Sequence, residues 1–552
     1  MGNGSFDYAR FLRSPSVQAM LLAVAIAAAY LFMDTRATLW DRDEPRFARA
    51  TAEMVASGDY LVPTFNGQLR PDKPILIYWL MSIPMRVLGP TELACRFFGS
   101  IGTAVTCWLT FFIGKRLLNT RVGLWAMAIL ATSLMMLYMG TAATADGVLL
   151  PFMVAQMAVF VGFATSTRRG WAQVLLGLAV GGALLAKGPV GGMPLLALAV
   201  TVGLARRPYP TVWRLRELTL AGGLGLILFL LWALPANAAT EGEFFRQGIG
   251  HHVLSRAAKP LEHHGGRFLL YLPYYLPVIL IGLFPWTLFL PGALSACLGR
   301  RLGGTPFRSL FLAWTVPLLI VMTLVATKLP HYILFLWPMA ALAIGATLDA
   351  VRHGSLAQQD LRWLQRGAGL FLAMSTLPGL ALIAAPWYVR MLDLPPATVL
   401  CGLVLLGEAA AVMWAMRTSK PQYLARILVA GTLAFLLPFL LYVMPAIETL
   451  KISPTLARMV REKGRDLPPI GTYDYAEPTL NFYIGATLDP LGTREALQAW
   501  LAIEGPGLLI ISQRALTELA AEGMNLNLDS LGSKRGFNYT KGNMMEIRLL
   551  AR

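Results

Sequence analysis

The sequence predicts a polytopic α-helical membrane protein with a small α/β domain at its carboxyl end. Of its 552 residues, 56% are hydrophobic and only 14% are charged, whereas a soluble domain has roughly 25% charged residues. Thirteen stretches approach the ~20 apolar residues that a membrane-spanning helix needs. After residue 450 the chain gains charge and its apolar runs become short. We therefore expect about 13 transmembrane helices over 1–450 and an α/β domain over 451–552.

The predicted spans follow one another with short connections. They cover 17–33, 95–118, 122–139, 144–166, 171–187, 189–204, 217–238, 267–294, 306–326, 330–348, 363–385, 395–416 and 423–445. The apolar stretch 74–89 could be a further span or a helix lying in the membrane interface.

The distribution of basic residues favours the interfacial alternative for 74–89. If 74–89 does not cross, the short loops that are rich in arginine and lysine all fall on one side, as cytoplasmic loops do. Their basic residues are Lys115, Arg116, Arg121, Arg168, Arg169, Arg206, Arg207, Arg214, Arg216, Arg300, Arg301, Arg308, Arg352, Arg362, Arg366, Arg417, Lys420 and Arg426. The short opposite loops carry Arg390 alone. We expect the amino end inside, and the first loop (34–94) and the carboxyl-terminal domain outside.

The first outer loop opens with a polar island, Trp40-Asp41-Arg42-Asp43-Glu44-Pro45-Arg46. Proline suits the first turn of a helix, so a helix is expected over 46–57, ending near Gly58. Asp43 and Glu44 then lie at its amino-terminal end, where the helix dipole favours anions. The alternative to a functional role for these acids is a purely structural one, as a helix cap with flanking acids, and for Asp41 the two interpretations have equal weight. A second polar group, Arg70-Pro71-Asp72-Lys73-Pro74, follows in the same loop.

Two further outer regions carry titratable side chains. The segment 239–266 holds four of the six histidines, and its candidate ligands for an anionic substrate are His251, His252, Arg256 and Lys259. The paired histidines lack the spacing of a metal site, so phosphate oxygens are the expected partners. The second region combines Lys328, His331 and Tyr332 with Asp146 and Lys187 at the outer ends of other spans.

Acids and bases from separate parts of the chain thus converge on one face of the membrane. Such a mixture indicates an anionic, phosphorylated and lipidic substrate. Ionisable residues within the spans, which would mark an ion path, are almost absent. The basic residues are scattered over loops on both sides, so the net charge of +17 gives no reason to expect nucleic acid. Cys95, Cys107, Cys297 and Cys401 lie in or beside apolar spans and are expected to be buried packing residues.

The carboxyl-terminal region alternates short apolar runs with helical patterns. The runs are Ile470–Tyr473, Leu508–Ile511 and Met545–Leu549, and helices are expected over 492–503 and 514–522. Strands that alternate with helices predict a small α/β domain.

The first loop resembles that of the lipid A aminoarabinose transferases, which are GT-C membrane glycosyltransferases. The likeness rests on Leu39–Ala48, Met54–Pro63, and Asp72-Lys73-Pro74 with Tyr78-Trp79. It implies transfer of 4-amino-4-deoxy-L-arabinose from undecaprenyl phosphate to lipid A phosphates at the outer face of the bacterial inner membrane, which gives resistance to polymyxin and cationic peptides. It implies no cofactor and no metal, and we expect a monomer.

The resemblance also implies roles for single residues. Asp43 matches the family's catalytic acid and Asp146 a second functional acid, while Asp72-Lys73 stands where the family has Glu-Lys, so the acid is one methylene shorter. Lys73 is the expected neutraliser of phosphate charge, since electrostatic stabilisation is the largest catalytic contribution. The expected substrate-binding residues are Glu44, Arg46, Asp72, Tyr78, Lys187, His251, His252, Arg256, Lys259, Lys328, His331 and Tyr332.

Two other functions remain open on the sequence. One is a protein O-mannosyltransferase-like enzyme with a polyprenyl-phosphate sugar donor, whose hydroxyl acceptor would need Asp43 as a true general base. The other is a flippase for lipid-linked sugars. Transporters commonly show internal repeats and polar sites at the membrane midplane, and neither is convincing here.

Overall fold

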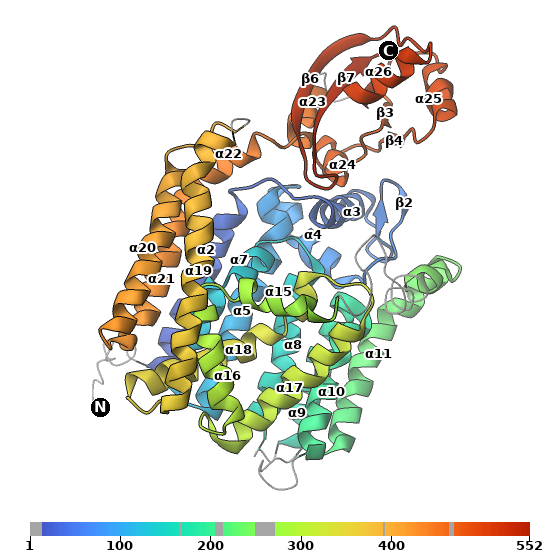
Figure 1. Cartoon of the computed structure of the whole chain (residues 1–552). Coiled ribbons are helices and arrows are strands. Elements are labelled where there is room, and N and C mark those ends of the chain that lie inside the picture. Colours follow the sequence, from blue (N-terminus) through green and yellow to red (C-terminus); the bar gives the residue numbers. More distant parts are fainter. Residues whose placement is uncertain (1–13, 165–167, 205–212, 249–270, 390–391, 463–467) are drawn as a thin grey trace, which may run out of the picture.

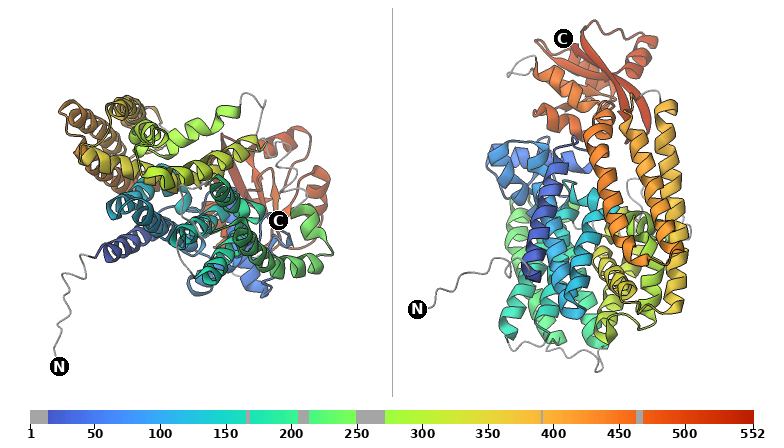
Figure 2. Two further views of the ribbon diagram at one scale, coloured as in Figure 1. Left: turned by 90° about the horizontal axis from the view of Figure 1, so that it is seen from below. Right: turned by 90° about the vertical axis from the view of Figure 1, so that its left-hand side faces the viewer.

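The computed structural model describes residues 14–164, 168–204, 213–248, 271–389, 392–462 and 468–552, and the statements below concern these residues. The molecule has two parts: a bundle of long helices, and a sheet region formed by the carboxyl-terminal residues at one end of that bundle (Figure 1). A second view shows that this sheet region lies beyond the ends of the long helices (Figure 2).

The long apolar helices occur where the hydropathy pattern predicts them. They are α2 (Pro15–Asp34), α5 (Glu92–Leu117), α8 (Ala145–Gly162), α9 (Arg169–Lys187), α10 (Met193–Leu204), α11 (Leu215–Ala239), α17 (Gly304–Leu324), α18 (Leu336–Arg352), α19 (Gln358–Tyr388), α20 (Ala397–Arg417) and α21 (Leu424–Pro438). In the described part of the chain, nine helices are long and apolar enough to cross a membrane, or up to 11 if each bent pair is one span. The figure of 13 crossings therefore stays a prediction.

Short helices connect or extend these long ones. They are α12 (Glu243–Phe245), α22 (Met444–Glu448), the 3-10 turns η1 (Gly188–Gly192), η5 (Pro330–Ile333) and η6 (Pro421–Tyr423), and the π-helical turn η7 (Phe439–Val443). At η1 the backbone passes close to the end of α9. Glycine is required at position 191, because a Cβ there would collide with the backbone of Ala183.

Two of the predicted spans are bent. Helix α6 (Thr120–Thr132) meets α7 (Leu134–Gly140) at 66°. The predicted span 267–294 is not one straight helix, because Leu272–Gly282 and Trp286–Leu298 meet at 114°. The elements of this bent pair are η3 (Leu272–Tyr274), α15 (Tyr275–Gly282), η4 (Trp286–Phe289) and α16 (Leu290–Leu298). Pro285 lies at the break, and proline cannot donate the backbone hydrogen bond that would continue a helix.

The first loop contains two helices and a hairpin. Helix α3 (Asp43–Ser57) confirms the helix predicted over 46–57 and ends at Gly58, whose φ of 75° closes it. The hairpin strands are β1 (Thr64–Phe65) and β2 (Gln68–Leu69). Helix α4 (Leu76–Leu88) has 13 residues, so at 1.5 Å per residue it is about 20 Å long, which is too short for a hydrocarbon core of about 30 Å. It packs against α3 and α5.

The three strands predicted in the carboxyl-terminal region appear where the sequence predicts them, and two further strands join them. The elements are α23 (Ser453–Arg461), β3 (Ile470–Tyr473), α24 (Pro478–Ile484), β4 (Asp489–Pro490), α25 (Arg494–Leu501), β5 (Leu508–Ser512), α26 (Gln513–Ala521), β6 (Asp529–Asn538) and β7 (Asn543–Ala551). The strand order is β4-β3-β5-β7-β6, with β3 parallel to β4 and β5, and β7 antiparallel to β5 and β6.

Both faces of this sheet are covered. On one face Ile510 and Ile547 pack against Leu456 of α23 and Leu480 of α24. On the other, Leu509 and Ile511 pack against α25 and α26 through residues such as Trp500 and Leu519. This covering explains why the β5 run is apolar at every position instead of alternating. We call residues 451–552 the sheet region; its α24 packs against α3 of the first loop.

The four cysteines are free and buried. We expect their joint replacement by alanine or serine to leave transfer activity intact and to lower stability only modestly, because each acts as a small packing residue. Activity and thermal unfolding of the cysteine-free variant test this. Loss of activity in a variant that unfolds at the wild-type temperature would assign one of them a functional role.

Candidate active site

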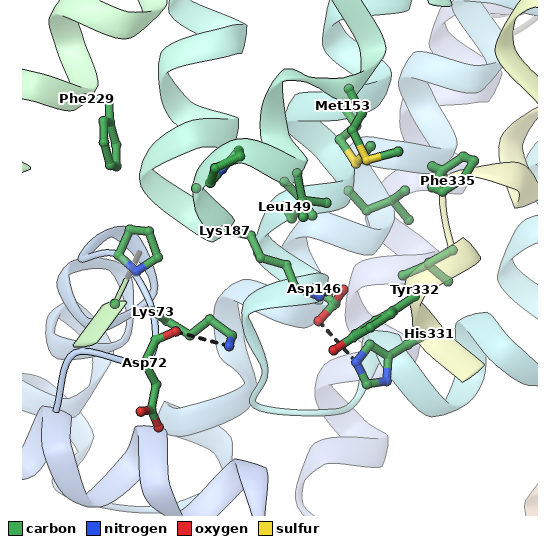
Figure 3. Close-up of a pocket in the computed structure, with 18 of the residues that line it drawn as sticks. Asp72, Lys73, Asp146, Leu149, Met153, Lys187, Phe229, His331, Tyr332 and Phe335 are labelled. Carbon is green, nitrogen blue, oxygen red and sulfur yellow. Dashed lines mark hydrogen bonds and ion pairs between the residues drawn. The ribbon is translucent and has the colours of Figure 1, made fainter. Parts of the chain in front are cut away.

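A cavity of about 360 Å³ lies between the first loop and the helical bundle. Its wall is built from segment 71–74, the start of α8, the turn from α9 into η1, and parts of α11, α17 and η5. Charged side chains gather at one end of it, and aromatic and aliphatic side chains form the rest (Figure 3). The cavity is therefore amphiphilic, with a charged end and an apolar wall.

Asp146 is the centre of the charged end. It lies in the first turn of α8, where the helix dipole favours an anion, and is only 7% exposed. Its Oδ1 accepts a hydrogen bond from Lys187 Nζ at 2.6 Å, and its Oδ2 lies 3.6 Å from His331 Nε2. Lys187 also lies over the ring of Tyr332, with 4.9 Å from Nζ to the ring centroid. Lys187 and His331, from two separate parts of the chain, thus flank one buried carboxylate.

His331 contributes a second polar group beside this carboxylate. It is partly buried at the start of η5 and lines the cavity, so its imidazole adds a hydrogen-bonding group to the charged end.

The other charged group comes from the first loop. Asp72 and Lys73 both line the cavity, and Lys73 Nζ donates to the carbonyl oxygen of Asp72 at 3.1 Å. Asp72 forms an ion pair with Arg70 at 3.0 Å. The Nε of Arg70 donates to the hydroxyl of the fully buried Tyr78 at 3.1 Å. Tyr78 therefore supports the Asp72 segment through Arg70 and does not itself line the cavity.

Asp43 is the first residue of α3 and is exposed. It makes no hydrogen bond or ion pair with another residue in the ranges that the structure describes. Asp43 does not line the cavity, but its charge acts on both Arg70 and His331. An exposed carboxylate near buried cations is available to a substrate.

Glu44 is not at the cavity, contrary to its expected substrate-binding place. It is 4% exposed, and its two carboxylate oxygens accept from Arg96 Nε at 2.8 Å and Arg96 Nη2 at 2.7 Å. The backbone N–H groups of Trp40 and Ala143 also donate to it. A carboxylate with four such donors is fully engaged, so Glu44 braces α3 against α5.

Two other expected ligands also lie away from the cavity wall. Lys328 donates its Nζ hydrogens to the carbonyl oxygens of Thr323 and Val325, at 2.5 and 2.8 Å. It thereby caps the end of α17, whose last carbonyl groups need such donors. Arg46 is half-buried on α3 and makes no ion pair within the described ranges.

The histidine-rich segment cannot be compared with its prediction. His251, His252, Arg256 and Lys259 lie outside the described residues. Across the positions that the structure does describe, there is no group of three or more histidine, cysteine or acidic side chains that could hold a metal ion.

The sequence did not single out the apolar wall. Phe229 and Trp232 of α11, Phe244 and Phe245 of α12, and Phe335 line the cavity. No sequence signal could have selected them, because nearly every position of the surrounding spans is apolar. Arg96 could have been selected from the sequence, because a charged residue within an apolar span usually has a specific partner.

Comparison with known proteins identifies relatives of the chain. Residues 72–233 match the family model for dolichyl-phosphate-mannose-protein mannosyltransferase. An undecaprenyl phosphate-alpha-4-amino-4-deoxy-L-arabinose arabinosyl transferase from Edwardsiella ictaluri is 31% identical over 415 residues, which cover 73% of this chain and 72% of the relative. The chain belongs to the aminoarabinose transferase family. The transferase of the same name from Pectobacterium carotovorum is 32% identical over 385 residues, or 67% of each chain.

The fold of this aminoarabinose transferase family member matches a solved structure over nearly its whole length. The crystal structure of ArnT from Cupriavidus metallidurans bound to undecaprenyl phosphate aligns with a TM-score of 0.72, covering 96% of this chain and 97% of the other at 20% identity. The apo structure of the same protein gives 0.73. These likenesses confirm the predicted GT-C type fold.

Proposed function

We propose that this chain transfers 4-amino-4-deoxy-L-arabinose from undecaprenyl phosphate to a phosphate group of lipid A. The observation that carries the proposal is the amphiphilic cavity in a chain of the aminoarabinose transferase family. Its charged end contains Lys73 and Lys187, and its wall contains Phe229, Trp232 and Met153. A ligand with a phosphate head and an isoprenoid tail matches both halves.

The transfer exchanges one phosphate oxygen for another at the anomeric carbon. An oxygen of the lipid A phosphate attacks that carbon, and the bond to the donor phosphate breaks, leaving undecaprenyl phosphate. A phosphate monoester has a second pKa near 6, so the acceptor is largely dianionic at neutral pH. It needs little general-base help. Positive charge grows on the sugar in the transition state, and a nearby carboxylate stabilises it; we assign this role to Asp43.

Lys73 and Lys187 are the proposed partners of phosphate charge. Burying a lone charge at the cavity wall would be costly. The ion pair with Asp146 therefore allows the Lys187 ammonium group to lie there. Lys73 approaches from the first loop, on the other side of the charged end. Cations from two directions would relieve the repulsion between donor and acceptor phosphates.

Analysis of lipid A from cells with and without this gene product tests the function. Mass spectrometry should find the aminoarabinose substituent on lipid A phosphate only when the chain is present, together with increased survival in polymyxin. Unmodified lipid A in cells that contain the inserted protein and the donor lipid would refute the proposal.

The family match over 72–233 favours a second candidate, an enzyme that transfers a sugar to protein hydroxyl groups. This alternative predicts glycosylated serine or threonine in envelope proteins of the same cells. A glycoprotein survey of those cells distinguishes the two, because the lipid A transferase leaves the proteins unchanged.

We also propose that the first loop and the sheet region face the periplasm and that the protein acts as a monomer. The concentration of arginine and lysine in the opposite loops supports the orientation. One chain supplies the whole cavity wall, so a second copy is not needed for the chemistry. Reporter fusions after residues 240 and 552 would test the orientation.

A further inference from the structure

The first loop is attached to the sheet region at two separate points. One is the segment that leads into α3, and the other is the tip of the β1–β2 hairpin. Asp43 directly follows the first point, and Asp72 and Lys73 shortly follow the second. One attachment therefore lies next to Asp43, and the other next to Asp72 and Lys73, which the first loop contributes to the charged end of the cavity.

The first attachment centres on Asp41, two residues before Asp43. Its carboxylate accepts from the backbone N–H of Thr479 at 2.8 Å and from the Thr479 hydroxyl at 2.5 Å. The backbone N–H of Asp41 donates to the hydroxyl of Tyr539 at 2.9 Å. Thr479 is 2% exposed, so these bonds are shielded from water.

Neighbouring residues strengthen this attachment. The hydroxyl of Tyr483 accepts from the backbone N–H of Leu39 at 2.7 Å. Lys451 donates to the carbonyl oxygen of Thr38 at 2.7 Å and lies 3.7 Å from the ring centroid of Trp40. The sheet region therefore holds a continuous piece of backbone, not a single side chain.

The second attachment is Asn66, which adopts a left-handed conformation with φ of 54° at the hairpin tip. Its Oδ1 accepts from the backbone N–H of Leu488 at 2.9 Å and from Asn481 Nδ2 at 3.0 Å. Its Nδ2 donates to the carbonyl oxygen of Leu488 at 2.8 Å. The side chain thus pairs with Leu488 as a strand backbone would.

We propose that the sheet region is a two-point clamp that fixes Asp43 relative to Lys73, with Asp41, Asn66 and Thr479 as positioning residues. The inference rests on the proposed function, because the separation of Asp43 and Lys73 matters only if transfer takes place between them. A misplacement of about 1 Å at a reacting centre can cost about 10²-fold in rate. A loop can keep its side chains positioned to within about 1 Å only where it is attached to the rest of the protein.

The test uses the full-length protein and one variant at each point. Thr479→Val removes the hydroxyl, which bonds Asp41 and also Ser453, and keeps the backbone bond to Asp41. Asn66→Ala removes the second attachment. We expect kcat to fall about tenfold in each and about 100-fold in the double variant, while KM for the donor changes less than about twofold. Thr479→Ser keeps the hydroxyl and should restore kcat.

Ser512→Ala is the matched control. Ser512 is also a buried hydroxyl of the sheet region, where it binds Asp474 and caps α26, but it does not touch the first loop. It should lower stability at least as much as Thr479→Val and leave kcat unchanged. Wild-type kcat in the double variant, with an inactive Asp43→Asn protein in the same assay, would overturn the clamp and leave the function standing.

Hydrogen exchange tests the clamp without any transfer reaction. The amides of Leu39 and Asp41 should exchange faster in Thr479→Val than in wild type or Ser512→Ala. Equal exchange in all three proteins would overturn the attachment. If wild-type protein fails to modify lipid A but the three proteins show this exchange pattern, the proposed function is refuted and the attachment is supported.

The rate of hydrogen exchange in this segment should also depend on pH, and the direction of that dependence follows from the pKa of Asp41. Burial raises the pKa of Asp41 to about 6, opposed by the Thr479 bonds and assisted by the charge of Glu477. When the segment detaches, the pKa returns to its ordinary value of 3.8. The attached form therefore binds more protons between about pH 4 and 6, so attachment tightens as pH falls through 6 and loosens as it rises.

Other charged and titratable groups surround Asp41. They are Arg42, which lies 3.8 Å from Glu477, with Lys451, Tyr475 and Tyr539. Exchange at Leu39, corrected for its intrinsic pH dependence, should be slower near pH 5 than near pH 7.5 in wild type. Asp41→Asn should remove this difference. Its persistence in that variant would assign the pH effect to one of the surrounding groups.

Discussion

Asp43→Asn should abolish transfer and leave the protein folded and membrane-inserted. Asp43 is exposed at the start of α3 and forms no hydrogen bond with any described residue, so its replacement by an amide of the same size removes no packing. The amide carries no charge to stabilise the sugar in the transition state. We expect kcat to fall by at least about 10²–10³, the cost of one lost electrostatic contact in a catalytic site.

The assay combines purified protein, the lipid-linked aminoarabinose donor and lipid A, with thermal unfolding measured on the same sample. Asp59→Asn is the matched control, because Asp59 is an exposed acid just past the other end of α3. It should transfer at the wild-type rate. Wild-type transfer by Asp43→Asn would remove Asp43 from the mechanism.

Lys73→Ala should lower the rate by about 10²–10³, the cost of one lost electrostatic contact in a catalytic site. Lys73 lines the charged end of the cavity, and without it the phosphate charge that develops on the leaving lipid lacks its partner on the first-loop side. Lys73→Arg keeps the charge and should recover part of the rate. Lys420→Ala removes an exposed lysine far from the cavity and should change nothing.

The same assay separates phosphate binding from metal binding. His252→Ala should cost less than Lys73→Ala, and EDTA should have little effect. Strong inhibition by EDTA that added zinc reverses would contradict the phosphate-only mechanism. It would assign Asp72 and the histidines of 239–266 to a metal site.

Hydropathy predicted the helical part of the fold well, because a lipid environment demands long apolar helices whatever their packing. It could not predict the 114° bend before Trp286, since bending depends on neighbouring helices as much as on Pro285. In the sheet region, β3, β5 and β7 were visible as buried apolar runs. Strand β6 (Asp529–Asn538) was missed because it is polar, contains glycine and is only partly buried.

The charged end of the cavity was predicted from topology, which brought Asp146, Lys187 and His331 to one face of the membrane. Topology gave no distances, and so it could not distinguish residues that line the cavity from those that support it. Glu44 illustrates the difference. Its partner, Arg96, lies 52 positions away, and no local pattern in the first loop reveals that pairing.

The attachment of Asp41 to Tyr539 also has a consequence for biosynthesis. The two residues are 498 positions apart, and at roughly 5–20 residues per second their synthesis is separated by roughly 25–100 s. The first loop therefore reaches the membrane surface long before its binding partners exist. On the clamp proposal, a nascent chain that has already inserted its helices works about 100-fold more slowly than the finished protein, and full activity requires almost the whole sheet region. An unfinished transferase stalled in the membrane would thus consume the pool of lipid-linked sugar only slowly.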